Sequence, residues 1–183
     1  MKTYNSQPNS PLSANVERIS ALEYLEAGAK AERNGVDKPA FKHIQDELER
    51  LPMARQRLTF EMLQLVWQSL ERGEEPGLGA VFGGSYWSAI EPQRSSEYRV
   101  WLEKIILRSF ELRSRLSNPP GDDGPFGMIL STMLIALGKV DRSRFSAILE
   151  NLKRRGGEEK LDPRWKVIAR VAELFLTLGE SEN

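Results

Sequence analysis

Hydrophobic residues recur along most of the chain at the three- and four-residue spacing that is typical of amphipathic helices. Leu63, Val66, Trp67 and Leu70 follow this spacing, and comparable stripes appear in six other segments. No segment alternates apolar and polar residues for long enough to indicate a β-strand. The pattern therefore predicts an all-α fold, a single compact multi-helix domain of about seven or eight helices.

Capping and helix-breaking residues give the expected helix boundaries. Asn34-Gly35 and Gly73 are stop signals, whereas Asp141 and Asp162-Pro163 are start signals. We expect helices over residues 13–33, 37–51, 59–72, 95–116, 125–137, 141–155 and 163–178. Residues 1–12 are polar and contain two prolines, so we expect a flexible N-terminal segment 1–12 followed by a helical domain 13–183.

The segment from Gly73 to Ser85 holds five glycines and Pro76, and this composition predicts a loop with a short helical turn near residues 86–90. Its glycine spacing fits neither a dinucleotide-binding loop nor a P-loop. Tyr86 and Trp87 follow the glycines, and we expect them to be partly exposed. Because aromatic residues are enriched at interface hot spots, residues 78–90 are our candidate for an element that faces a partner.

The predicted last helix, 163–178, is apolar on two sides, which is more than a surface helix normally needs. It is therefore either central in the globule or covered by a partner, which includes a second copy of the chain. The candidate partner-binding residues from these two regions are Leu78, Phe82, Tyr86, Trp87, Val167, Val171, Leu174 and Leu178.

Composition excludes several kinds of chemistry. The chain has no cysteine, so disulfides, thiolate metal sites and thiol nucleophiles are excluded. His43 is the only histidine, and we interpret it as a solvated or hydrogen-bonded surface residue. The acidic pairs, such as Asp122-Asp123, lack the ligand pattern of a calcium loop. We therefore expect no cofactor, no metal and no catalytic site.

Two features bear on location. The longest apolar run covers residues 126–137, whereas a membrane span needs about 20 residues, so the sequence predicts no membrane span. The polar N-terminus lacks the apolar region of a signal peptide, and we expect a cytoplasmic protein.

The net charge of the chain is zero, but the charges are unevenly distributed. Residues 1–93 hold 10 basic and 13 acidic side chains, and residues 94–183 hold 16 and 13. The most basic window, 139–170, has 10 basic and 5 acidic residues. A clustered basic face is the electrostatic footprint of nucleic-acid binding. The candidate phosphate-binding residues are Arg142, Arg144, Lys153, Arg154, Arg155, Lys160, Arg164 and Lys166. Alternatively, this window is solvated, pairs with the acidic N-terminal half, or binds an acidic protein.

No motif is specific enough to indicate a family. The sequence favours a non-enzymatic helical interaction or regulatory protein, an adaptor or an accessory subunit of a complex. The first alternative is a helical nucleic-acid-binding accessory protein that uses its basic C-terminal helices on phosphates. The second is an enzyme with a dispersed carboxylate active site.

Overall fold

The computed structural model describes residues 16–114 and 125–158, together with Leu174 and Thr177. Within these residues it contains seven α-helices, two short 3-10 helices and no strand, which confirms the all-α prediction. The chain divides into two compact units, residues 1–58 and 59–183. The division into residues 1–12 and 13–183 stays a prediction.

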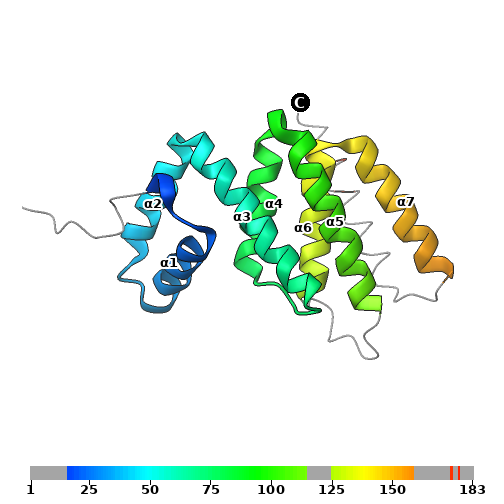
Figure 1. Ribbon diagram of the computed structural model, residues 1–183, viewed down its shortest axis with the longest axis horizontal. Helices are drawn as coiled ribbons and strands as arrows, with labels where there is room; N and C mark the ends of the chain where they lie inside the picture. Colours follow the sequence, from blue (N-terminus) through cyan, green and yellow to red (C-terminus); the bar gives the residue numbers. More distant parts are fainter. Residues whose placement is uncertain (1–15, 115–124, 159–173, 175–176, 178–183) are drawn as a thin grey trace, which may run out of the picture. The chain divides into compact units, whose positions relative to one another are not determined.

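The first unit consists of η2 (Val16–Arg18), α1 (Ala21–Asn34), α2 (Lys38–Arg50) and the first turns of α3 (Pro52–Glu71) (Figure 1). α1 begins later than predicted because Ser20 forms a capping box, in which its hydroxyl oxygen accepts a hydrogen bond from the Glu23 backbone N–H. α1 ends where predicted, since Gly35 adopts a left-handed conformation with φ of 65°. Tyr24 packs against Phe41 of α2, with 5.1 Å between ring centroids.

α3 is seven residues longer at its N-terminus than the predicted helix 59–72. α2 ends just before Pro52, and Pro52 opens α3 directly after Leu51, the C-terminal cap of α2. Proline is well tolerated at the first position of a helix because its missing N–H needs no partner there. At the other end, Gly73 has φ of 73° and stops α3 as predicted.

The second unit contains the rest of α3, α4 (Leu78–Ile90), η3 (Pro92–Arg94), α5 (Ser95–Ser114), α6 (Pro125–Val140) and α7 (Arg142–Glu158). α6 packs against α4, α5 and α7. Successive helices alternate in direction, so that α4 and α6 run the same way (Figure 1). The buried sides of α3, α4, α5, α6 and α7 form an apolar core that includes Met62, Leu63, Val81, Leu102, Ile105, Leu134, Leu137 and Phe145.

The prediction of a loop over residues 73–85 is wrong, because most of this segment belongs to α4. The glycines allow close helix packing and do not interrupt the helix. A Cβ at Gly84 would lie 2.9 Å from Cδ2 of Leu63 on α3, and one at Gly83 would overlap the Met62 sulfur. Tertiary packing therefore overrides the low helix propensity of glycine here.

Candidate functional site

Four large apolar side chains are exposed along the outer face of α4. Leu78 is 39% exposed, Phe82 42%, Tyr86 64% and Ile90 41%. Residues four positions apart lie on one side of a helix, so the four side chains form a continuous row, which we call the α4 stripe. Single apolar residues scattered over a surface are normal, whereas contiguous exposed apolar patches are more typical of interaction sites.

A groove of about 360 Å³ runs beside the α4 stripe, between α4 and α6. Its residues are Phe82, Ser85, Tyr86, Ala89 and Ile90 from α4, and Thr132, Ile135, Ala136 and Lys139 from α6. The Ser85 hydroxyl donates to the Val81 carbonyl oxygen at 2.7 Å, so this polar group is satisfied within α4. Most of the lining is apolar, and among the described residues that form it Lys139 is the only Lys, Arg, Asp or Glu. The groove thus offers apolar contact along its length and a positive charge at the end formed by the last turn of α6.

The structure brings three of the eight candidate partner-binding residues together. Leu78, Phe82 and Tyr86 lie on the α4 stripe, whereas Trp87 lies beside it and is half-buried. Sequence reasoning did not single out Ile90, although its four-residue spacing from Tyr86 was a usable signal once α4 is known to be a helix.

The other four candidates come from the predicted last helix. Val167, Val171 and Leu178 lie outside the described residues. Leu174 is helical and 47% exposed. Among the described residues, the apolar candidate site is therefore formed by α4 and α6.

The basic candidates are only partly described. Lys160, Arg164 and Lys166 lie outside the described residues, as do the side chains of Lys153 and Arg155 on α7. Arg142 and Arg154 are exposed, and Arg144 forms an ion pair with Glu103 of α5, with 3.2 Å between Nε and Oε2. Glu103 belongs to the C-terminal half of the chain, so this ion pair of Arg144 is not the pairing with the acidic N-terminal half that was one of the alternatives.

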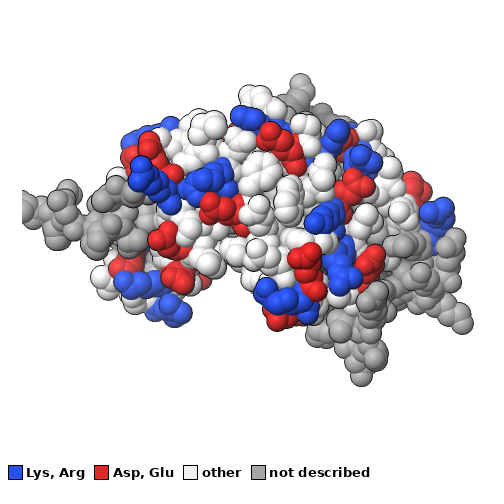
Figure 2. All heavy atoms as spheres, in the orientation of Figure 1, with Lys and Arg blue, Asp and Glu red and all other residues white. Residues whose placement is uncertain are grey.

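Cationic side chains of α5 are also engaged within the second unit. Lys104 Nζ lies 3.6 Å from the centroid of the Trp67 ring, in cation–π geometry. Arg108 donates to the Leu70 carbonyl oxygen at 3.4 Å and pairs with Glu111. On the face shown in Figure 2, basic and acidic side chains lie next to one another, and no large area carries one sign.

Asp141 joins α6 to α7 and acts as the N-terminal cap of α7. Its Oδ1 accepts hydrogen bonds from the Arg144 backbone N–H and the Ser143 hydroxyl, each at 3.0 Å. Its Oδ2 pairs with Arg99 of α5 at 3.2 Å. The hydrogen bond from Arg144 N–H, followed by those from Ser143 and Arg99, lowers the pKa of Asp141. Asp141 therefore fixes the start of α7 on α5, as its predicted capping role implies.

Two titratable side chains, His43 and Tyr98, bear on acid–base chemistry. His43 is exposed on α2. Tyr98 is fully buried on α5, where burial and then the nearby Glu91 carboxylate raise its pKa to about 12. Its ring packs against Phe60 with 5.0 Å between centroids, so Tyr98 is a neutral core residue at physiological pH. Among the described residues no group of three or more His, Asp or Glu side chains could hold a metal ion.

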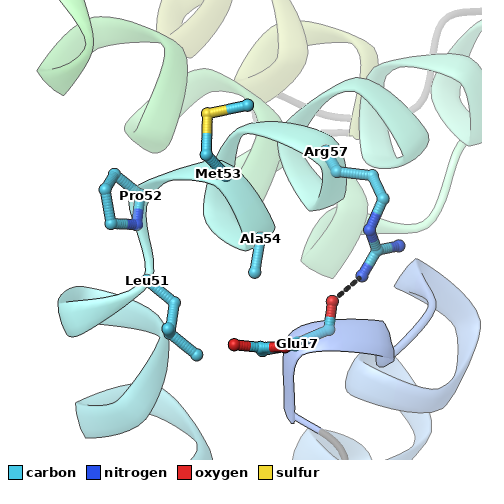
Figure 3. Close-up of a pocket in the computed structure, with 6 residues that line it drawn as sticks. All are labelled: Glu17, Leu51, Pro52, Met53, Ala54 and Arg57. Atoms are coloured by element: carbon cyan, nitrogen blue, oxygen red, sulfur yellow. Dashed lines mark hydrogen bonds between the residues drawn. The ribbon is translucent and has the colours of Figure 1, made fainter.

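A second hollow, of about 490 Å³, lies within the first unit (Figure 3). Glu17, Leu51, Pro52, Met53, Ala54 and Arg57 line it. The Arg57 guanidinium donates to the backbone carbonyl oxygens of Glu17 at 3.1 Å and Ile19 at 2.7 Å. Figure 3 shows it turned toward η2. Arg57, which lines this hollow, thus joins η2 to α3.

Comparison with protein-family models, with curated proteins and with solved structures finds no match for this chain. Across the described residues, every helix is too short or too polar to cross a membrane.

Proposed function

We propose that this protein is a non-enzymatic, cytoplasmic interaction protein, an adaptor or accessory subunit, that binds a protein partner through the α4 stripe. The observation that carries the proposal is the row of four exposed apolar side chains on one helix. Burying them would remove apolar surface from water, which is the main favourable term in most protein association.

The packing of α4 supports this proposal. Gly83 and Gly84 hold the inner face of α4 close against α3, so the outer face is presented on a fixed helix. Side chains on a rigid element lose little conformational freedom on binding, and this lowers the cost of association. Tyr86 is the most exposed member of the stripe, and tyrosine is enriched among interface hot spots.

The nucleic-acid alternative stays a prediction. Among the described residues, the cations at Arg144, Lys104 and Arg108 already have partners in the same unit. They would contribute less to phosphate binding than unpaired cations, because the existing interaction of each must first be broken.

Site-specific photo-crosslinking in the cells that naturally produce the protein tests the proposal. A benzoylphenylalanine replaces Tyr86 in one variant, and Val100 in a matched control, since Val100 is an exposed apolar residue on α5 that is 57% exposed. We expect discrete protein adducts from position 86 and none from position 100. An absence of protein adducts at 86 would refute the proposal, and adducts removed by nuclease treatment would favour the nucleic-acid alternative.

A further inference from the structure

We infer that the partner covering the α4 stripe is a second copy of this chain, with the two α4 helices packed antiparallel about a twofold axis. This inference rests on the proposed function, because it names the occupant of the same surface. Three properties of α4 and its neighbours support it: the spacing of the stripe, the absence of charge on α4, and the placement of two charged residues at its ends.

The spacing of the stripe is self-complementary. An interface with twofold symmetry requires that if residue i contacts residue j, then j contacts i. In an antiparallel pair centred between Phe82 and Tyr86, Phe82 of each copy meets Tyr86 of the other, and Leu78 meets Ile90. The four residues are evenly spaced and span roughly 18 Å, at 1.5 Å per residue. Every member of the stripe therefore has an apolar counterpart in one register.

The outer face of α4 lacks the charges that normally prevent a surface helix from associating with itself. Residues 78–90 contain no Lys, Arg, Asp or Glu. Two such helices approach without like-charge repulsion and without burying an unpaired charge, which is strongly unfavourable. Depletion of charge at the centre is also what distinguishes interface cores from the rest of a protein surface.

Charged residues flank the two ends of α4, and their signs select the antiparallel orientation. Because α4 and α6 run the same way, Lys139 lies at the Ile90 end of the groove. Glu75 lies three residues before Leu78, at the other end, and is exposed. Neither Glu75 nor Lys139 has an ion-pair partner among the described residues, whereas Glu74 pairs with Arg72.

An antiparallel arrangement places Lys139 of each copy near Glu75 of the other, so two opposite-charge pairs form at the rim. A parallel arrangement would instead place Lys139 near Lys139 and Glu75 near Glu75. Charge complementarity at the rim fixes the orientation of an interface more than it adds affinity. The antiparallel dimer is thus the arrangement that satisfies both the apolar row and the charges.

Sedimentation equilibrium over a range of concentrations tests the dimer. We expect the wild-type chain to reach twice its 20.8 kDa mass, and Phe82→Asp to stay monomeric because it places a charge at the centre of the interface. Val100→Asp, an equally polar change on α5, should dimerise like the wild type. Circular dichroism checks that each variant is folded.

A charge exchange tests the register. Lys139→Glu and Glu75→Lys should each weaken dimerisation by on the order of tenfold, because each turns two attractive rim pairs into repulsive ones. The double variant restores opposite signs and should recover most of the wild-type affinity. Two single effects that simply add in the double variant would overturn the predicted contact.

Cysteine crosslinking tests the orientation, and the natural chain has no cysteine to interfere. A mixture of Leu78→Cys and Ile90→Cys chains should form an intermolecular disulfide, while either variant alone should not. Crosslinking of Leu78→Cys with itself would show a parallel pair and overturn the inference.

A wild-type chain that stays monomeric at all concentrations also overturns it. In that case adducts of Tyr86 with a different protein would leave the proposed function standing, and an absence of adducts would remove both.

Discussion

The outer face of α4 and the surface formed by α5 and α7 belong to the same unit but differ in the chemistry of their side chains. On α5 and α7, charged groups meet within the chain, as Arg144 does with Glu103 and Arg99 with Asp141. On α4 there is no charge, and four large apolar side chains face outward. Charged side chains of the α5–α7 surface thus have partners within the chain, whereas the apolar side chains of the α4 stripe stay exposed to solvent.

The same contrast exists within α4, between its two faces. The inner face carries the small residues Gly83 and Gly84 against Met62 and Leu63 of α3, while the four large residues of the α4 stripe lie outside. A helix whose only task was to fill the core would place its large side chains inward. This distribution supports the proposal that the outer face serves recognition.

The largest expected effect is the loss of stability when the inner face of α4 is disrupted. Gly84→Leu should lower the free energy of unfolding by about 1–3 kcal/mol, because overpacking a close helix contact forces α3 and α4 apart. Tyr86→Ala removes a larger side chain from the outer face, yet at concentrations where the chain is monomeric it should change stability by only about 0.5 kcal/mol or less. Urea unfolding followed by circular dichroism measures both changes.

Two further variants control this experiment. Gly77→Ser adds a side chain where a Cβ meets nothing within 4 Å, so it should be nearly neutral. Leu63→Ala combined with Gly84→Leu should recover part of the loss, since the removed volume makes room for the new side chain. If Tyr86→Ala proved as damaging as Gly84→Leu, the outer face would be part of the core and the contrast would fail.

The sequence was sufficient for the fold class and for several helix ends, because these depend on local signals. Gly35 and Gly73 adopt positive φ and end helices, and the Asp141 carboxylate caps α7. Each of these roles depends on a residue and its immediate neighbours. Periodicity identifies the helices themselves for the same reason.

Local signals could not predict that residues 78–90 form a helix. Glycine at a helix end and glycine at a helix–helix contact have the same local propensity, and only the identity of the facing residues, Met62 and Leu63, separates them. The groove also needs α6, which is distant in sequence, to supply Ile135 and Lys139. The aromatic cluster after the glycines drew attention to this segment, but the four-residue row was visible only once α4 was known to be a helix.

A smaller effect concerns the cap that joins α7 to α5. Asp141→Ala should lower stability by about 1 kcal/mol, the usual value of a helix N-cap. Because the pKa of Asp141 is lowered in the folded protein, the stabilisation by its charge is complete above the ordinary Asp pKa of about 3.9. It is lost as the pH falls through the lowered folded value.

Asp141→Asn separates the cap from the charge, since asparagine caps a helix and does not titrate. Thermal unfolding at several pH values should show the wild type ahead of Asp141→Asn at pH 7, with the difference shrinking as the pH falls below 4. A difference that grows on acidification would mean that the carboxylate destabilises the fold.

The smallest effect tests whether the α5–α7 surface is satisfied within the chain. Arg144→Glu and Glu103→Arg should each cost roughly 0.2–1 kcal/mol, because the pair is partly exposed, and the double exchange should restore most of the loss. High salt should shrink these effects, since it screens exposed charges. If Arg144→Glu instead left stability unchanged but abolished retention of DNA or RNA at low salt, Arg144 would act outward and not toward Glu103. The α5–α7 surface would then face a partner of its own, and the contrast with the α4 stripe would become one between two recognition surfaces of different chemistry.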